Sequence, residues 1–379
     1  MPPPTSTLSS ISSEDDAHLA RALELAHRSI GLAHPNPMVG AVVVKKGRIV
    51  GEGFHEYDKL DHAEIRALAA AGSQARGATM YVSLEPCCNT GRTGPCTDAI
   101  IAAGICRVVC AMKDPNPSVA GKGFDRLRKA GIRVDFGARE AEAQRLNEAF
   151  ACWIRTGRPL VTLKTALTLD GKIAMPIKRA TWITSDASRK EVQNIRHASD
   201  AVMTGIGTVL IDNPRLTDRT GLPRRRRLLR IVVDTHLRTP LKSKLVHSAD
   251  GDVLIYTLEA TSSQKALDLI HAGVEVVRVP PRRGRLDLRE VIRDLGSRQV
   301  LSVLLEGGSR LNGSALEYRI VDKVVLFYAP QIMGTGGIPM AEIPCRWFPK
   351  SPSLRVTALG RHGPDFSMEG YFRDVYRDH

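Results

Sequence analysis

The stretch from His62 to Cys96 constrains this chain more than any other part of it. It opens with His62-Ala63-Glu64, continues to Glu85-Pro86-Cys87-Cys88 and closes with Cys96. One His and two Cys thiolates are a ligand set that catalytic zinc takes while a fourth position stays open for water. A Glu two residues after the His, with Pro-Cys downstream, is typical of zinc-dependent nucleobase deaminases. The stretch therefore predicts a zinc site that activates water to remove an amino group from a nucleobase-like ring.

The residue types assign the roles within this site. We expect His62, Cys87 and Cys96 to bind zinc, which lowers the pKa of its water toward neutrality. Glu64 would take the proton from that water and pass it to the departing amine. Cys88 is a rival ligand, but two neighbouring cysteines rarely reach one tetrahedral centre. We prefer Cys87 with Cys96, each at or near a helix start, where the helix dipole stabilises thiolates.

Length and cysteine usage bound the class of protein. A chain of 379 residues is too long for one ordinary core, so we expect two domains. We expect residues 1–13 to be disordered, the first domain to span 14–157 and the second to span 158–379. Five of the seven cysteines fall between Cys87 and Cys110, which favours metal binding in a reducing compartment over disulfides. The N-terminus lacks a signal peptide, and no apolar run is long enough to span a bilayer. We expect a cytoplasmic protein without a membrane partner.

The net charge of +14 is unevenly distributed. Residues 1–150 hold 18 basic and 17 acidic side chains, so the remainder carries +13. A basic half indicates an anionic partner, either nucleic acid or a phosphorylated small molecule. The runs Arg224–Arg227 and Pro280–Arg285 have little aromatic interleaving, and solvated loops are the better interpretation of both.

Alternating strand and helix patterns predict an α/β fold with a largely parallel sheet in the second half, and ligands at the C-terminal ends of its strands. We expect one long helix from Ala138 to Arg155 and a last clear strand at Val324–Tyr328. Gly205-Ile206-Gly207-Thr208 and Gly307-Gly308-Ser309 each follow a predicted strand, where backbone amides can approach a phosphate. Neither is a complete dinucleotide fingerprint, but together in a basic domain they favour a nucleotide cofactor.

These motifs also resemble one family along nearly the whole chain, the bifunctional riboflavin-biosynthesis deaminase–reductases. The matching segments of the first half are Pro35–Gly40, His62-Ala63-Glu64, Glu85-Pro86-Cys87, Gly91-Arg92-Thr93, Cys96 and Asp114–Gly123. Those of the second half are Leu169–Lys172, Trp182-Ile183-Thr184, Gly207-Thr208-Val209, Asp212–Pro214 with Leu216-Thr217, and Glu306-Gly307-Gly308.

The resemblance implies a cytidine-deaminase-like domain followed by a dihydrofolate-reductase-like domain. The first would deaminate 2,5-diamino-6-hydroxy-4-(5-phosphoribosylamino)pyrimidine, and the second would reduce the ribosyl group to ribityl with NADPH. The family positions for NADPH fall on Ala166, Trp182, Thr208, Asp212, Thr235, Gly308, Ser309, Arg310, Leu311, Asn312, Gly313 and Ser314. Those for the phosphorylated substrate fall on Arg196, Leu216, Arg219 and Glu306. The two guanidinium groups suit phosphate, because each can pair two oxygens at once. The resemblance also implies a homo-oligomer.

Three positions depart from the family pattern. Asn89 stands where a His is usual, Gly94 where a Pro is usual, and Ala180 where a substrate-contacting Ser is common. No zinc ligand is lost, so we expect both activities. Two other hypotheses compete with this one: an editing deaminase that binds nucleic acid through its basic half, and a single-activity enzyme with one structural domain. The low aromatic content of 5% counts against the first, and we expect no nucleic-acid partner.

Overall fold

The computed structural model describes residues 11–176, 182–258, 263–282, 284–343 and 353–377. The chain divides into two compact units, which are described separately below. The first holds Met1–Thr156 with the short segment Pro223–Arg226, and the second holds Gly157–Leu222 and Arg227–Arg377. Within the described residues, no helix is long and apolar enough to cross a membrane.

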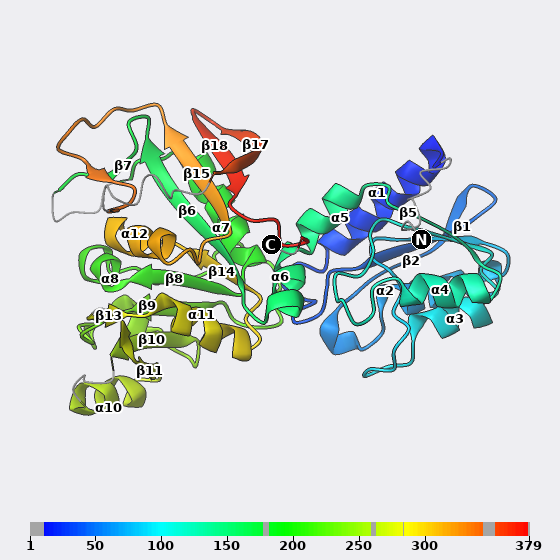
Figure 1. Cartoon of the computed structure of the whole chain (residues 1–379), viewed down its shortest axis with the longest axis horizontal. Helices are drawn as coiled ribbons and strands as arrows, with labels where there is room; N and C mark the ends of the chain where they lie inside the picture. Colours follow the sequence, from blue (N-terminus) through cyan, green and yellow to red (C-terminus); the bar gives the residue numbers. More distant parts are fainter. Residues whose placement is uncertain (1–10, 177–181, 259–262, 283, 344–352, 378–379) are drawn as a thin grey trace, which may run out of the picture. The chain divides into compact units, whose positions relative to one another are not determined.

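The first unit is a five-stranded sheet in the order β2-β1-β3-β4-β5. β1 pairs antiparallel with β2 and β3, whereas β3, β4 and β5 run parallel. Figure 1 shows α1 and α5 on one face of this sheet and α2, α3 and α4 on the other. Its elements are α1 (Ser13–His27), β1 (Gly40–Lys45), β2 (Arg48–Phe54), α2 (Ala63–Ala71), β3 (Thr79–Val82), α3 (Cys96–Ala102), β4 (Arg107–Cys110), α4 (Lys122–Lys129), β5 (Arg133–Phe136), α5 (Glu140–Leu146) and α6 (Glu148–Thr156).

Two glycines of β2 let α2 lie against the sheet. A Cβ at Gly51 would stand 2.2 Å from the Ala67 carbonyl oxygen, and one at Gly53 would stand 2.4 Å from that of Ala63. Any larger residue at these positions would push the helix outward. The two glycines therefore set the depth at which α2 presents its N-terminus.

The second unit is a nine-stranded sheet in the order β11-β10-β9-β8-β14-β6-β15-β18-β17. The strands from β11 to β15 run parallel, and only β18 and β17 at one edge are antiparallel, so the prediction of a largely parallel sheet is confirmed. Its elements are β6 (Leu160–Thr168), β7 (Lys172–Ala174), α7 (Asp186–Ala198), β8 (Ala201–Gly205), α8 (Ile206–Asp212), β9 (Leu229–Val233), α9 (Lys244–His247), β10 (Val253–Leu258), α10 (Ser263–His271), β11 (Glu275–Val279), β12 (Pro281–Arg282), β13 (Arg285–Leu286), α11 (Leu288–Ser297), β14 (Ser302–Leu305), α12 (Ser309–Glu317), β15 (Lys323–Ala329), β16 (Ile338–Pro339), β17 (Arg355–His362) and β18 (Asp365–Tyr371).

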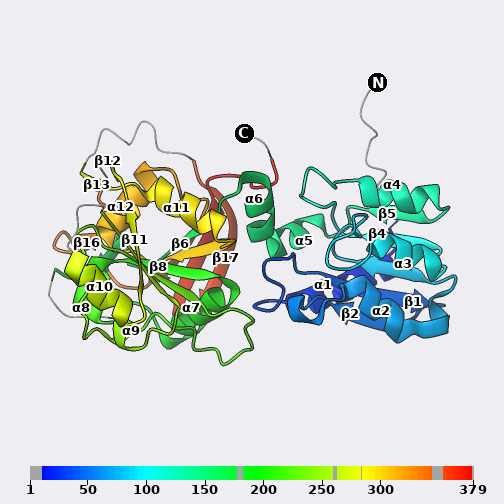
Figure 2. The ribbon, with the colours of Figure 1, turned by 90° about the horizontal axis from the view of Figure 1, so that it is seen from below.

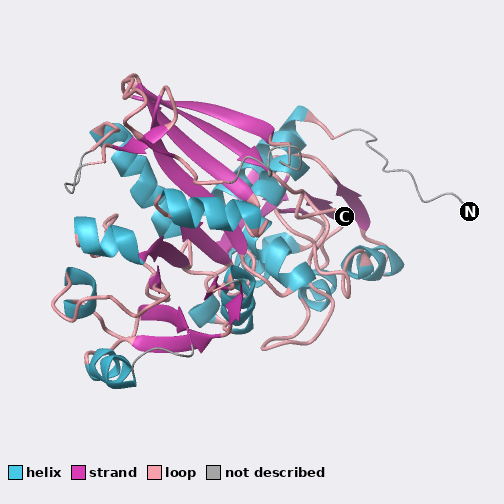
Figure 3. Ribbon diagram, turned by 60° about the vertical axis from the view of Figure 1, so that its left-hand side comes forward, coloured by secondary structure: helices cyan, strands magenta, loops and turns pink. Residues whose placement is uncertain are grey.

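Apolar side chains cover both faces of this sheet. On one face, α11 and α12 pack against the strands through residues such as Val291 and Leu316, and on the other, α8, α9 and α10 pack through residues such as Val209 and Leu269. Figure 2 shows these two helical layers on opposite sides of the strands. Figure 3, coloured by secondary structure, shows the central strands with helices beside them.

The structure corrects two expectations about the elements. Ser12 and Ser13, assigned to a disordered N-terminus, form the cap and first residue of α1, because Ser12 and Asp15 bond each other's backbone N–H in a capping box. The helix expected from Ala138 to Arg155 is two helices that meet at Asn147, whose side chain bonds the N–H and C=O of Met38. Gly205-Ile206-Gly207-Thr208 begins at the end of β8 as expected, with Gly205 as the N-cap of α8.

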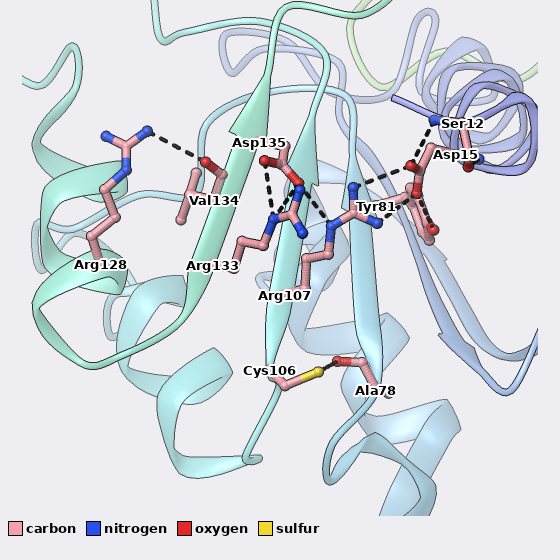
Figure 4. Close-up of polar contacts among 10 residues, drawn as sticks. All are labelled: Ser12, Asp15, Ala78, Tyr81, Cys106, Arg107, Arg128, Arg133, Val134 and Asp135. Atoms are coloured by element: carbon pink, nitrogen blue, oxygen red, sulfur yellow. Dashed lines mark hydrogen bonds and ion pairs between the residues drawn. The ribbon is translucent and has the colours of Figure 1, made fainter. Parts of the chain in front are cut away.

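A buried polar network ties α1 to the sheet of the first unit. The Asp15 carboxylate accepts hydrogen bonds from the Tyr81 hydroxyl at 2.7 Å and from the Arg107 guanidinium at 2.7 and 3.1 Å (Figure 4). Burial alone would raise the pKa of Asp15, but the bonds from Arg107, Ser12 and Tyr81 outweigh it and hold that pKa well below its usual range. This network therefore stabilises the face of the sheet that carries α1.

Candidate active sites

His62, Cys87 and Cys96 come together in the first unit. His62 is the N-cap of α2, Cys87 follows β3, and Cys96 is the first residue of α3. Their ligand atoms all lie within 4.8 Å of one another, with His62 Nδ1 at 3.2 Å from Cys96 Sγ and 3.5 Å from Cys87 Sγ. Cys88 is outside this group, and its thiol contacts the Asn89 side chain. The geometry thus favours Cys87 over its neighbour.

The donor set and its spacing fit a zinc ion. Ligand bonds of about 2.3 Å to sulfur and 2.1 Å to nitrogen in a tetrahedral site place the two atoms roughly 3.6 Å apart, close to the separations of His62 from the two thiols. Hydrogen bonds from the Cys96 thiol, from His62 and from the Cys96 backbone N–H lower the pKa of Cys87, whereas the bond to Cys87 and burial raise that of Cys96. Cys87 is therefore stabilised as the thiolate that zinc requires, beside the start of α3 as expected.

Glu64 lies in the first turn of α2, two residues after His62, and only 3% of it is exposed. Burial raises the pKa of its carboxyl to about 7. A carboxyl with a pKa near the working pH can both accept and release a proton during a reaction. Its place beside the three ligands is what the deaminase pattern predicts for the proton-transferring residue.

Two residues that sequence reasoning did not assign to the site lie next to it. His55 is buried, its ring stands 5.2 Å from that of His62 edge to face, and its Nε2 lies 3.0 Å from Asn36 Nδ2. Burial and the proximity of His62 lower the pKa of His55 to about 4, so the neutral ring can accept a hydrogen bond from the Asn36 amide. The Pro35-Asn36-Pro37 turn was the signal in the sequence that could have led to this pair.

In the second unit, a cluster of charges joins Arg196 and Glu306. The Arg196 guanidinium donates to both Glu306 carboxylate oxygens at 2.6 and 3.0 Å, and Lys164 Nζ lies 3.0 Å from the same carboxylate. Burial would raise the pKa of Glu306, but the charges of Lys164 and Arg196 outweigh it and lower that pKa to about 2. Lys164 was missed at the sequence level, although a Lys inside the apolar strand β6 is an unusual signal.

The loop after α8 carries the other predicted substrate residues. Leu216 is buried, with a backbone φ of +56°, and Arg219 is exposed, with its backbone N–H donating to the Gln193 side chain. The same loop is held by the Arg196 guanidinium, which donates to the Thr217 carbonyl, and by His197, whose Nδ1 lies 2.8 Å from the Asp218 carboxylate. Arg196 therefore contacts both Glu306 and the loop, whereas Arg219 points outward.

The predicted NADPH positions gather at the carboxyl ends of the parallel strands in the large sheet. Ala166 lies near the end of β6, Thr208 and Asp212 lie on α8 after β8, Thr235 follows β9, and Gly308 caps α12 after β14. Because these four strands run parallel, their carboxyl ends lie on the same side of the sheet. Trp182 and Ile183 line a cavity of about 420 Å³ at the end of β6, together with Thr168, Met175, Gln331, Ile332 and Met333.

The start of α12 fits a phosphate-bearing cofactor. Among the described residues, the buried side-chain oxygens Ser309 Oγ and Asn312 Oδ1 have no hydrogen-bond partner, and the N-cap Gly308 has open space where a Cβ would stand. Free backbone amides at a helix start favour an anion. Two other predicted NADPH positions on α12 have different surroundings. Arg310 is exposed, and Gly313 packs against the Glu342 carbonyl. Ala180, the third departure from the family pattern, lies outside the described residues.

Comparison with known families and proteins assigns both units. Residues 159–361 match the family model of the RibD C-terminal domain, and residues 12–112 match the cytidine and deoxycytidylate deaminase zinc-binding region. The riboflavin biosynthesis protein RibD of Aquifex aeolicus is 42% identical over 351 residues, which cover 93% of this chain and 96% of that protein. Its counterpart in Escherichia coli is 39% identical over 367 residues, with 94% and 98% covered.

Solved structures agree with these relatives. The structure of Acinetobacter baumannii RibD (form 1) has a TM-score of 0.84 at 34% identity and covers 94% of this chain and 98% of that one. The Thermotoga maritima diaminohydroxyphosphoribosylaminopyrimidine deaminase/5-amino-6-(5-phosphoribosylamino)uracil reductase has a TM-score of 0.81 at 36% identity, with the same coverage. The expected fold class, two enzyme activities, and Zn²⁺ and NADPH as cofactors are thereby confirmed. The chain belongs to the RibD family of bifunctional deaminase–reductases of riboflavin biosynthesis.

Proposed function

We propose that the first unit removes a ring amino group from 2,5-diamino-6-hydroxy-4-(5-phosphoribosylamino)pyrimidine, and that the second unit then reduces the ribosyl group of the product to ribityl with NADPH. The observation that carries the proposal is the convergence of His62, Cys87 and Cys96 beside the buried Glu64, in a chain that also has a RibD C-terminal domain. The Thermotoga maritima relative bears the names of both reactions.

In the deamination, His62, Cys87 and Cys96 would hold zinc. The bound ion supplies the Lewis acidity that makes water a nucleophile near neutral pH. Glu64 then accepts a proton from the attacking water and delivers it to the leaving amine. The buried position of Glu64 in the first turn of α2 keeps its carboxyl beside the ligands and away from bulk water.

In the reduction, NADPH supplies the hydride. It would be held by the start of α12 and by Thr208 and Thr235, which lie after β8 and β9. Lys164 and Glu306 offer a donor and an acceptor that suit the hydroxyl groups of a ribosyl chain. Arg196 holds the Glu306 carboxylate in place, and the exposed Arg219 is available to the substrate phosphate.

A coupled assay tests the proposal. The wild-type chain, supplied with the phosphorylated diaminopyrimidine, should release ammonia and then oxidise NADPH. A Glu64→Gln variant should do neither with that substrate, but it should oxidise NADPH when the deaminated intermediate is supplied. NADPH oxidation without release of ammonia would contradict the order of the two steps, and a metal-free preparation that deaminates normally would contradict the zinc mechanism.

We also propose that the chain has two catalytic domains, the first starting with α1 and ending near residue 157, and that the enzyme acts in the cytoplasm as a homo-oligomer without nucleic acid. None of the six cysteines among the described residues is in a disulfide, which suits a reducing compartment. Separate expression of the two fragments tests the boundary. Light scattering tests the oligomer, and a gel shift with duplex DNA and tRNA at low salt tests the editing-deaminase alternative.

A further inference from the structure

The carboxylate of Glu85 has an unusual set of partners. Only 4% of the residue is exposed, and it lies two positions before Cys87. Its Oε2 accepts backbone N–H groups from Asp114 at 3.1 Å and Gly121 at 2.9 Å. Its Oε1 accepts those of Gly123 at 2.9 Å and Phe124 at 3.3 Å. One buried side chain therefore binds four amides from a segment about 30 to 40 residues further along the chain.

These amides are largely those that α4 leaves unsatisfied. The N-cap of α4 is Gly121, in the left-handed region at φ +84°, and it has no side chain to cap the helix. An N-cap side chain normally accepts from the second and third residues of the helix, which are Gly123 and Phe124 here. Glu85 takes this role from a different part of the chain, and its negative charge also suits the positive end of the helix dipole.

Close packing fixes the same junction. A Cβ at Gly123 would stand 2.2 Å from the Pro86 carbonyl oxygen, so α4 contacts the backbone next to Cys87 directly. The backbone N–H of Glu85 donates to the Met112 carbonyl at 3.0 Å, which ties the residue to the end of β4. Glu85 thus joins the segment that carries Cys87 to β4, to the loop 113–121 and to the start of α4.

From this geometry we infer that Glu85 is a positioning residue for deamination: it holds the Cys87 segment against α4 and so fixes one zinc ligand relative to the other two. Cys96 and His62 are placed by the helices α3 and α2, whereas Cys87 lies in a loop, so it depends most on such an anchor. The inference rests on the proposed zinc site.

The test compares Glu85→Gln with a matched variant, Asp15→Asn. Both remove a buried carboxylate from the first unit, but Asp15 belongs to the α1 network of Figure 4. Zinc release to a chelator, deaminase kcat and KM, reductase rate and Tm are measured on the full-length zinc-loaded protein. Loss of a residue that orients a metal ligand typically costs 10–100-fold in metal affinity or activity.

We expect Glu85→Gln to release zinc at least about ten-fold faster and to lose deaminase kcat by a similar factor, with partial rescue by excess zinc and an unchanged reductase rate. Asp15→Asn should lower Tm without faster zinc release. If Glu85→Gln does not accumulate as folded protein, Gly123→Ala disturbs the same junction from α4 and should give the same zinc phenotype. A Glu85→Gln protein that keeps wild-type zinc release and kcat overturns the inference, even if Tm falls. Wild-type protein that binds no zinc overturns the proposed function instead.

Discussion

Two carboxyl groups in this enzyme show how burial alone does not determine a residue's charge. Glu64 is buried, and burial raises the pKa of its carboxyl to about 7 because the nearby His62 and Cys96 only partly offset it. Glu306 is also buried, but Lys164 and Arg196 lower its pKa to about 2. The first group is suited to exchanging protons near neutral pH, whereas the second stays ionised as a fixed acceptor.

Replacement of Glu64 by Gln should therefore separate proton transfer from metal binding. General acid–base groups typically contribute 10²–10⁴-fold, so we expect deaminase kcat to fall by about that factor while the zinc content stays near wild type. Steady-state kinetics and metal analysis of the same preparation measure both quantities. A variant that loses its zinc together with its activity would contradict this separation of roles.

The low pKa of Glu306 predicts a dependence of stability on pH. Its folded-state pKa is depressed from 4.5 to about 2, so the stabilisation is complete above about pH 4.5 and is lost as pH falls toward 2. A carboxyl with a comparable shift contributes roughly 2–3 kcal/mol at neutral pH. Urea unfolding between those two pH values measures it. Lys164→Met should reduce this dependence, and an equally steep loss in Lys164→Met would show that other carboxyl groups cause it.

At the scale of elements, the deaminase ligands depend on how closely helices lie on the small sheet. His62 and Glu64 are both at the start of α2, and α2 can approach β2 only because Gly51 and Gly53 lack side chains. The position of the helix is therefore part of the geometry of the site, although neither glycine touches a ligand.

A methyl group at Gly53 should accordingly damage the deaminase. The new Cβ would overlap the Ala63 carbonyl, and overpacking of this kind typically costs about 1–3 kcal/mol. We expect Gly53→Ala to lower both the stability of the first unit and its deaminase rate, with a normal reductase rate. Gly94→Ala is the control, because its methyl group meets nothing within 4 Å. Equal losses in the two variants would exclude displacement of α2 as the cause.

At the scale of the whole molecule, each of the two units has its own sheet and its own site. The proposed zinc ligands all lie in the first unit, and the Lys164–Glu306–Arg196 cluster lies in the second. A ligand that binds only the folded state stabilises the unit that holds it by mass action. Zinc should therefore act on one unit alone.

Removal of zinc should inactivate and destabilise the first unit selectively. We expect a chelator to abolish deamination and to lower one of two calorimetric transitions, and we expect NADPH oxidation of the deaminated intermediate to continue at its normal rate. Added zinc should restore both losses. A chelator that slows the reductase equally would show that the two sites are not independent.

The proposed zinc ligands and Glu64 were readable in the sequence because the spacing within each motif is short. His62 and Glu64 are two residues apart, and Cys87 and Cys96 are nine residues apart. Periodicity likewise predicted most of the strands of both sheets. Asn147 was not readable as a helix break, because its partner Met38 lies 109 residues away. Lys164 was missed for the same reason, since its partner Glu306 lies just after the distant strand β14. Strands β17 and β18 were also missed.

The order of residues by itself determined the chemistry of the ligand set, the two-part organisation and the α/β class, because each depends on residue types at short separations. Tertiary structure decided which thiol faces His62, which cations surround Glu306, and that Glu85 caps a helix to which it is not connected locally. Those outcomes depend on contacts between segments far apart in the chain, and only the packed fold brings such segments within hydrogen-bonding distance.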